Sequence, residues 1–235
     1  MDDKRRLIVS SPFLGKEITS YGLVVYSLST NRCVIVQRKH SIGFIFIIKG
    51  IYRLSYLPII MSDMTTAEAD IVARCLVDDE YFTHIYCTEL KCSSTGLQQA
   101  RERLHNFKDI FTSLLNNIKF NKFLAWGFPK GKLHCMEETP FDCAIREFKE
   151  EVEVDLPEPL YISNNYITER TNAINGNIID SHYWLYIIQD EMCIDNVVYH
   201  EEISSRVWVD TSTCKLLGLN NSILLALEEL VSTLK

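Results

Sequence analysis

The sequence predicts an α+β protein with a mixed β-sheet and a helical block inserted into it. Strand-like runs occur near the start of the chain and again after residue 122, whereas residues 41–121 carry helical patterns. Because the block interrupts strand-like sequence, we expect both flanks to share one sheet. The expected division is an N-terminal part of the sheet domain (1–40), a helical insertion (41–121) and the main sheet domain (122–235).

The first expected element is a β-hairpin. SYGLVVYSL (20–28) and RCVIVQRK (32–39) are rich in β-branched and aromatic residues, and the STN sequence between them is a turn signal. In the helical block, Thr65 and Glu68 have the spacing of a capping box at a helix start. LQQARERLHNFKDIFTSLLNNI (97–118) repeats apolar residues every three or four positions, which predicts one amphipathic helix.

The main sheet domain should contain several strands and two helices. One helix follows Thr139, and a second closes the chain after a cap at Asn220 or Asn221. The Asn175-Gly176 dipeptide is a turn signal between two strand-like runs. The expected strands are KFLAWGF (122–128), LYISNNYITER (160–170), NIIDSHYWLYIIQ (177–189) and SRVWVD (205–210).

The composition fits a soluble globular protein, and the net charge does not indicate a nucleic-acid binder. The 235 residues are 47% hydrophobic and carry a net charge of −7. The charge is uneven: residues 1–40 hold 7 Lys or Arg against 3 Asp or Glu, whereas residues 122–235 hold 9 against 19. Such acidity is unusual for a part that meets phosphates unless cations intervene.

Cysteine usage and hydropathy favour a cytosolic protein. The chain has 8 cysteines with no CxxC pair and no zinc-type spacing, so we expect free thiols in a reducing compartment. The apolar run IGFIFII (42–48) is too short to span a bilayer, and the first residues lack the apolar core of a signal peptide. We therefore expect no membrane association and a cytoplasmic location. Nothing in the sequence indicates the oligomeric state.

The helix after Thr139 carries an unusual group of glutamates. Thr139 should cap it, with Pro140 in the first turn. At about 100° per residue, one stripe should be buried, and Glu147, Glu150 and Glu151 cluster on an arc beside it. The stripe consists of Phe141, Ala144, Ile145, Phe148 and Val152.

Two interpretations of these glutamates are open. One is an ordinary solvated face with the ion pairs Arg146–Glu150 and Lys149–Glu153. The other is a metal site. WGFPKGK (126–132) ends a strand and opens a loop before the helix, which brings backbone carbonyls near the carboxylates. Such hard oxygen ligands suit Mg²⁺ or Mn²⁺, which would also relieve the repulsion between the glutamates.

Residues Gly131–Val154 resemble the Nudix box of Nudix hydrolases, G-x5-E-x7-R-E-U-x-E-E-x-G-U, in which U is bulky and apolar. The matching residues are Glu138, Arg146, Glu147, Phe148, Glu150, Glu151 and Val154. Two positions depart from it. Six residues instead of five separate Gly131 from Glu138, and Glu153 replaces the last glycine, which usually ends the helix in a left-handed conformation at little strain. The resemblance implies a Nudix fold.

A narrower resemblance points to mRNA decapping. WGFPKGK is similar to the stretch before the box in the cellular mRNA-decapping Nudix enzyme. The order of hairpin, helical block and box resembles the decapping Nudix enzymes of large cytoplasmic DNA viruses, such as that of African swine fever virus. This resemblance implies a viral protein of the host cytoplasm that releases 7-methylguanosine diphosphate from capped mRNA and leaves 5′-monophosphate RNA.

The resemblance also implies residue roles. Glu147, Glu150 and Glu151 would hold Mg²⁺ or Mn²⁺, with the Lys130 or Gly131 carbonyl as a further ligand. Arg146 would orient a glutamate, and Glu138 would stabilise the loop. HEEISSRVWVD (200–210) is similar to the decapping family's E-I-x-x-x-x-W stretch, which makes Glu202 a general base or extra ligand; the alternative is an ordinary loop acid.

Several basic and aromatic side chains are candidates for substrate contacts. Arg38, Lys39, Lys130 and Lys132 are candidates for phosphate or RNA binding, and the 41–121 block would bind RNA through Arg101, Arg103 and Lys108 unless these are only solvated. Trp126, Tyr183 and Trp208 fit the core better than a cap sandwich, and His134 should lie exposed in the loop. Two other functions stay open: a phosphohydrolase for diphosphoinositol or dinucleoside polyphosphates, and a non-catalytic RNA-binding Nudix module.

Overall fold

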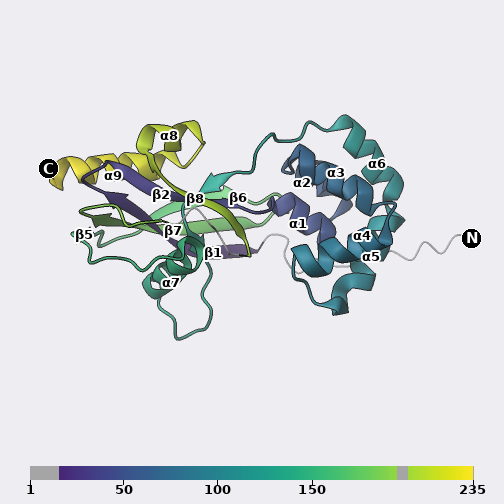
Figure 1. The fold of residues 1–235 in the computed structure, drawn as a ribbon, viewed down its shortest axis with the longest axis horizontal. Helices are drawn as coiled ribbons and strands as arrows, with labels where there is room; N and C mark the ends of the chain where they lie inside the picture. The colour runs from purple at the N-terminus through teal and green to yellow at the C-terminus, as the bar shows by residue number, and fades with distance from the viewer. Residues whose placement is uncertain (1–15, 195–200, 235) are drawn as a thin grey trace, which may run out of the picture. The chain divides into compact units, whose positions relative to one another are not determined.

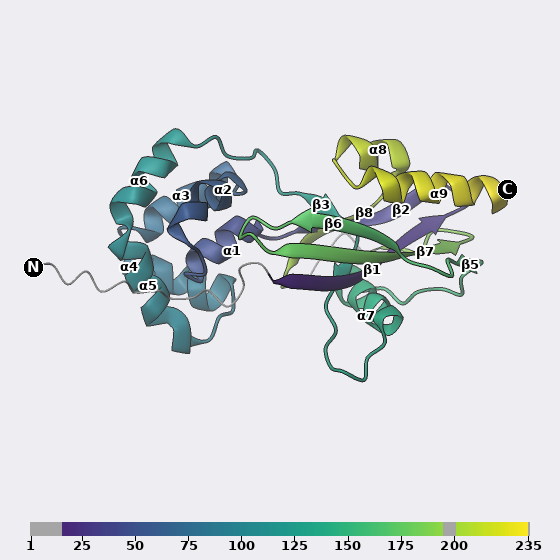
Figure 2. The same ribbon diagram turned by 180° about the vertical axis from the view of Figure 1, so that it is seen from behind.

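The computed structural model describes residues 16–194 and 201–234, which form two compact units (Figures 1 and 2). The sheet unit contains residues 17–41, 121–172 and 178–234, and the helical unit contains residues 42–120 together with the turn 173–177. Residues 1–15 of the expected N-terminal part lie outside the described residues.

The sheet unit is built on a mixed β-sheet. Strand β1 pairs in parallel with β7 along its whole length, from Glu17↔Ile178 to Ser27↔Ile188. The other pairs are antiparallel: β1 with β2 and β4, β2 with β3 and β8, and β7 with β5 and β6. The strands are β1 (Glu17–Ser27), β2 (Arg32–Arg38), β3 (Trp126–Gly127), β4 (Lys130–Gly131), β5 (Tyr161–Ile162), β6 (Ile167–Asn172), β7 (Ile178–Ile188) and β8 (Ile203–Asp210).

Helices cover both faces of this sheet, so each face has its own core (Figure 1). Helix α7 (Pro140–Val152) packs on one face through Ala144, Phe148 and Val152. Helices α8 (Thr211–Leu216) and α9 (Asn221–Leu234) pack on the other face, where Ile223 and other aliphatic side chains are fully buried. The α+β fold class with a mixed sheet is therefore confirmed. Because strand side chains alternate, each of the two central strands contributes to both cores.

The helical unit has a separate core of aliphatic and aromatic side chains, centred on residues such as Phe44, Ile60 and Phe82. The predicted capping box is present: the Glu68 amide donates to Thr65 Oγ1, and the Thr65 amide donates to Glu68 Oε2. Its elements are α1 (Ile42–Ile48), η1 (Leu54–Tyr56), α2 (Leu57–Ser62), α3 (Thr66–Cys75), α4 (Asp79–His84), η2 (Ile85–Glu89), η3 (Ser94–Gly96), α5 (Leu97–Asn106) and α6 (Lys108–Asn117).

Three expected elements are shorter or more broken than the sequence pattern suggests. The helix expected over 97–118 is interrupted at Phe107, whose φ of −117° and ψ of 21° are not helical. The break lets α5 pack on α1 and α4 while α6 packs on α2 and α3, which one straight helix could not do. The expected strand 122–128 is formed only at β3, and that expected over 160–170 is divided between β5 and β6.

No helix within the described ranges is long and apolar enough to cross a membrane.

Candidate active site

Helix α7 begins as the sequence predicts. The side chain of Thr139 accepts a hydrogen bond from the Asp142 amide (3.1 Å), and its hydroxyl donates to the Asp142 carboxylate (2.6 Å). The predicted apolar stripe packs on the sheet, with Phe148 fully buried and Phe141 at the edge of the same core. This packing fixes the rotation of α7, so that the residues beside the stripe lie next to strand β4.

Strand β4 runs unusually close to β1. It pairs Lys130 with Gly22 and Gly131 with Tyr21. A Cβ added at Gly22 would lie 2.3 Å from the Pro129 carbonyl oxygen, so only glycine allows this approach. The Leu23 amide donates to that same carbonyl (3.3 Å). Two residues of β4 are thereby held at a fixed distance from the glutamates of α7.

Two of the three predicted glutamates touch β4. A Cβ added at Gly131 would lie 1.9 Å from Cδ of Glu147, so this carboxylate lies directly against the glycine backbone. Glu151 is 7% exposed, and its Oε2 accepts a hydrogen bond from the Lys130 amide (3.1 Å). Burial raises the pKa of Glu151 to about 8, against the opposing effects of the Arg38 charge and the Lys130 amide. Glu150 lies farther out, with about half of its side chain exposed.

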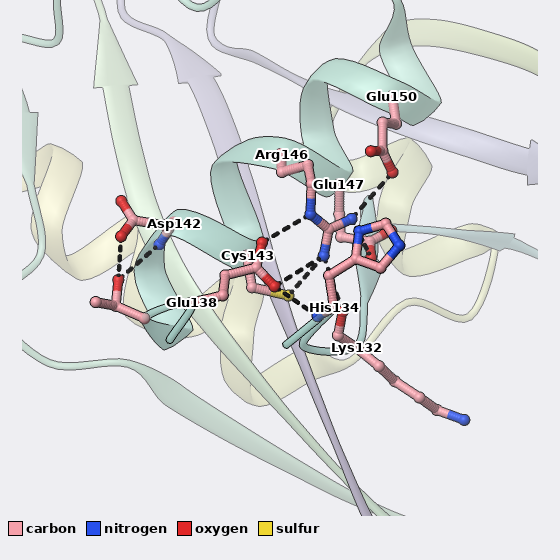
Figure 3. Close-up of polar contacts among 9 residues, drawn as sticks. Lys132, His134, Glu138, Asp142, Cys143, Arg146, Glu147 and Glu150 are labelled. Carbon is pink, nitrogen blue, oxygen red and sulfur yellow. Dashed lines mark hydrogen bonds and ion pairs between the residues drawn. The ribbon is translucent and has the colours of Figure 1, made fainter. Parts of the chain in front are cut away.

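Arg146 holds the loop before the helix and two of the glutamates together (Figure 3). Its guanidinium donates to both carboxylate oxygens of Glu138 (2.7 and 3.2 Å), to Glu147 Oε1 (2.8 Å) and to Glu150 Oε2 (3.0 Å). The Arg146 hydrogen bonds, followed by that of the His134 amide, lower the pKa of Glu138 to about 2. The expected orienting contact of Arg146 and the loop contact of Glu138 are thus both made.

The helix ends where the sequence departs from the Nudix pattern. Glu153 adopts the left-handed conformation, with φ of 54° and ψ of 34°, in place of the usual glycine. Its carboxylate pairs with the guanidinium of Arg206 (2.7 Å). The expected Lys149–Glu153 pair is therefore wrong: the reversal of the backbone at Glu153 turns its side chain toward β8, and Lys149 pairs with Asp155 instead (2.9 Å).

Arg38 and Glu202 lie within electrostatic range of Glu151. The Arg38 charge lowers the pKa of Glu151, and the Glu202 charge raises it. The two residues face each other at 3.9 Å, and the Glu202 side chain is 68% exposed. A backbone hydrogen bond joins the two segments that carry these residues, because the Lys39 amide donates to the Glu202 carbonyl (2.7 Å). The structure therefore brings Arg38, Glu202 and Glu151 together, as a shared site requires.

The two lysines of the WGFPKGK stretch have different surroundings. The Lys132 side chain is exposed, and its carbonyl accepts a hydrogen bond from Arg146 (2.9 Å). The Lys130 ammonium donates to Ser181 Oγ (3.0 Å) and lies 3.6 Å from Glu169. The Lys132 side chain is thus open to solvent, whereas Lys130 is engaged within the sheet unit.

Two of the three cations predicted to form a basic face on the helical unit are half-buried. Arg101 donates to Thr83 Oγ1 (2.7 Å), and Arg103 donates to the Tyr52 carbonyl and stacks over the Tyr52 ring. Lys108 alone of the three predicted cations is exposed. Arg101 and Arg103 each hold neighbouring segments of the helical unit together, and RNA binding through this face stays a prediction.

Aromatic side chains gather on the α7 face of the sheet, at the edge of its core. The Tyr166 ring lies 4.2 Å from the His182 ring, and Tyr166 is 48% exposed. Tyr21, the partner of Gly131 in the sheet, lies 5.6 Å from His182. Of the aromatics weighed from sequence, Tyr183 and Trp208 are buried in the cores. The period-two pattern of β6 and β7 could have indicated this cluster only with the register known.

The donor groups of this site fit a divalent metal, although they are not assembled around one. Within the described ranges, no three His, Cys, Asp or Glu side chains converge closely enough to hold a metal ion. Arg146 instead occupies the position between Glu147 and Glu150. Carboxylates beside backbone carbonyls are nevertheless the ligands that Mg²⁺ and Mn²⁺ prefer, and the raised pKa of Glu151 reflects a buried carboxylate that a cation would stabilise.

Comparison with known proteins finds a family model whose matched range includes α7. The NUDIX domain family model matches residues 114–222. Two curated yeast proteins match over 88 residues at 34% identity: mRNA-decapping enzyme subunit 2 of Saccharomyces cerevisiae (strain YJM789) and m7GpppN-mRNA hydrolase of strain ATCC 204508 / S288c. The match covers 37% of this chain but only 8% of each relative.

Two solved structures are also similar. Caenorhabditis elegans Ap4A hydrolase is 14% identical with a TM-score of 0.44, covering 93% of this chain and 98% of that one. Escherichia coli dihydroneopterin triphosphate pyrophosphohydrolase is 13% identical with a TM-score of 0.43, covering 94% and 99%. Neither similarity bears on the substrate. Residues 114–222 thus match the NUDIX domain family model, and part of the chain is similar in sequence to yeast decapping enzymes.

Proposed function

We propose that this chain is a metal-dependent Nudix hydrolase that removes the 7-methylguanosine cap of mRNA. The products would be 7-methylguanosine diphosphate and 5′-monophosphate RNA. The observation that carries this proposal is the contact of Glu147 and Glu151 with β4, beside Arg38. The partial similarity to the yeast decapping enzymes supports the choice of substrate. A viral origin and a cytoplasmic location remain predictions.

Glu147, Glu150 and Glu151 would hold Mg²⁺ or Mn²⁺, with the carbonyl of Gly131 or Lys130 as a further ligand. When bound, the metal would neutralise the phosphate chain and supply hydroxide near neutral pH. Arg146 would have to release Glu147 and Glu150 in part, and its two bonds to Glu138 keep it anchored when it does so. Arg146 is therefore proposed as a positioning residue for the carboxylates.

Glu202 has the exposure and the position of a general base or additional ligand. It lies near Glu151, yet its side chain remains open to solvent and to an attacking water. Arg38 would place positive charge next to the phosphates, and Lys39 and Lys132 would extend this charge toward the RNA. Charge-assisted bonds from such side chains position a phosphate chain for in-line attack.

The aromatic cluster of Tyr21, Tyr166 and His182 is the proposed contact for the cap base. Tyr166 offers an exposed ring supported by His182, and Asp180 lies close enough to influence the pKa of His182. A cationic 7-methylguanine is attracted both to aromatic faces and to neighbouring carboxylates. Because Tyr21 pairs with Gly131 and lies beside His182, this cluster is adjacent to the proposed metal ligands.

A hydrolysis assay tests the proposal against its alternatives. Cap-labelled RNA, a labelled diphosphoinositol polyphosphate and a dinucleoside polyphosphate are each incubated with the protein under Mg²⁺ or Mn²⁺, and the products are resolved by phosphate number. Release of 7-methylguanosine diphosphate is the expected result. Preferential cleavage of either small ligand would replace the cap as substrate. RNA binding without cleavage of any of the three would identify a non-catalytic module.

Variants identify the site that performs the reaction. Glu151→Gln preserves the shape of the side chain but removes the charge, and we expect a loss of about 10³-fold in rate. Glu229→Gln, on the exposed side of α9, is the matched control and should retain wild-type activity. Equal rates for Glu151→Gln and wild type would remove this carboxylate from the chemistry.

A further inference from the structure

A partly buried polar network lies on the α9 face of the sheet, opposite α7. Lys130 donates to Ser181 Oγ (3.0 Å), which also accepts a hydrogen bond from Ser20 Oγ (2.9 Å). The Lys130 ammonium lies 3.6 Å from Glu169 Oε2 and 5.3 Å from the centre of the Tyr183 ring. Ser181 is fully buried and Ser20 nearly so. Lys130 therefore ends in a prepared polar site and not in open solvent.

Glu169 connects this network to helix α9. Its second oxygen, Oε1, accepts a hydrogen bond from the Asn220 amide group (3.2 Å), and Oε2 accepts one from the Tyr183 hydroxyl (3.3 Å). Asn220 also accepts the Ser222 amide (2.9 Å), so it caps α9 at the same time. The carboxylate that neutralises Lys130 is thus held by two elements and has little freedom to follow a moving lysine.

The main chain of Lys130 serves the opposite face. Its amide donates to Glu151, and the next residue, Gly131, lies against the carboxylate of Glu147. Successive residues of a strand face opposite sides of the sheet, so the lysine side chain can be anchored on one side while Gly131 meets α7 on the other. Since β4 has only two residues, the Lys130 side chain adds a further anchor to its pairing with β1 and to the Leu23–Pro129 hydrogen bond.

We propose that Lys130 is a positioning residue, whose ammonium anchors β4 through Ser181 and Glu169 so that its backbone holds Glu151 and Glu147 in place for the metal. This inference rests on the proposed function for its catalytic consequence. It replaces the role of phosphate ligand expected for Lys130 from the sequence. A lysine that binds substrate would affect the Michaelis constant, whereas one that positions ligands affects the turnover number and the metal affinity.

The test compares Lys130→Met, Lys130→Arg and Glu169→Gln with Lys215→Met, all in the full-length chain. Lys215 is the matched control because it forms a lysine–glutamate pair with Glu228 (2.7 Å) away from β4. The first measurement is hydrogen exchange of the peptide containing Lys130 and Gly131, without metal or substrate. We expect exchange about tenfold faster in Lys130→Met than in the control, with less acceleration in Lys130→Arg.

The second and third measurements are Mn²⁺ affinity and steady-state kinetics. We expect Lys130→Met to bind Mn²⁺ more weakly and to lose about 10- to 100-fold in turnover, with the Michaelis constant nearly unchanged. Glu169→Gln should move all three readouts in the same direction while retaining the volume of the side chain, which guards against a folding defect confined to Lys130→Met. A raised Michaelis constant at unchanged turnover would show direct substrate binding and overturn the inference.

The exchange measurement separates this inference from the proposed function. Unchanged exchange at β4 would overturn the role of Lys130 even if the wild-type protein removes caps. Faster exchange in both Lys130→Met and Glu169→Gln, in a wild-type protein that does not cleave capped RNA, would support the anchor and reject only the cap as substrate.

Discussion

Replacing Glu153 by glycine restores the residue of the Nudix pattern, yet we expect it to destabilise the sheet unit. Glycine would relieve the left-handed backbone at this position, which is worth about 1 kcal/mol. The same change removes the carboxylate that pairs with Arg206 at 2.7 Å, and the Arg206 side chain is only 2% exposed. The sign of the effect therefore depends on which contribution is larger.

The ion pair is expected to be the larger contribution. Removing one partner of a buried pair costs about 3–5 kcal/mol, and the lower end applies because 31% of the Glu153 side chain is exposed. Subtracting the backbone gain leaves a net loss of about 2 kcal/mol. For a chain of this size, such a loss lowers the melting temperature by about 4–8 °C.

Tryptophan fluorescence during urea unfolding measures the stability of the sheet unit, because this unit contains all three tryptophans, Trp126, Trp184 and Trp208. Glu153→Asn is the matched variant, since asparagine tolerates the left-handed conformation but carries no charge. It should lose as much stability as Glu153→Gly. A double-mutant cycle with Arg206→Met then isolates the pair. Stabilisation by Glu153→Gly, or a coupling near zero, would refute the reasoning.

Three other predictions follow from single contacts. Gly131→Ala should push the Glu147 carboxylate away, which weakens Mn²⁺ binding and reduces turnover about tenfold or more. Because this carboxylate can swing away from the added Cβ, the unfolding free energy should stay within about 1 kcal/mol of wild type. Mn²⁺ binding as tight as in wild type would contradict this prediction. Thr139→Ala should cost about 1 kcal/mol in denaturant unfolding through loss of the helix cap, and Thr139→Ser should restore it. Burial raises the pKa of Cys143 to about 11, so its thiol stays protonated at pH 8. After iodoacetamide treatment at that pH, mass spectrometry should find the exposed Cys135 and Cys193 alkylated and the buried Cys143 unmodified.

The parts of the fold that could be predicted depend on local chemistry. The capping box at Thr65, the cap at Thr139 and the buried stripe of α7 each depend on residues within a few positions of one another. The same is true of the turn at Asn175-Gly176, where Gly176 has a φ of 86°. Such patterns fix a helix start or a turn whatever the rest of the chain does, so the sequence reveals them.

The break at Phe107 illustrates what local pattern cannot reveal. The apolar spacing from Leu97 to Leu114 continues through it without interruption, so the sequence predicts one helix. The break arises because α5 and α6 pack on different helices, and a local pattern does not reveal which helices these are. The ends of short strands behave in the same way, since β3 and β4 exist only where a neighbouring strand reaches them.

The candidate site shows the same contrast between local spacing, which the sequence reveals, and contacts across the sheet, which it does not. The sequence indicated that Glu147, Glu150 and Glu151 belong together, because helical spacing alone brings them to one side of α7. It named Lys130 among several cations for substrate contact, and its carbonyl as a possible metal ligand. Its actual partners, Ser181 and Glu169, come from two strands about forty to fifty residues away, and the alternation of β4 directs its side chain away from α7. A lysine next to an active site can therefore act through its backbone, and the side chain's partners across the sheet decide which role it has.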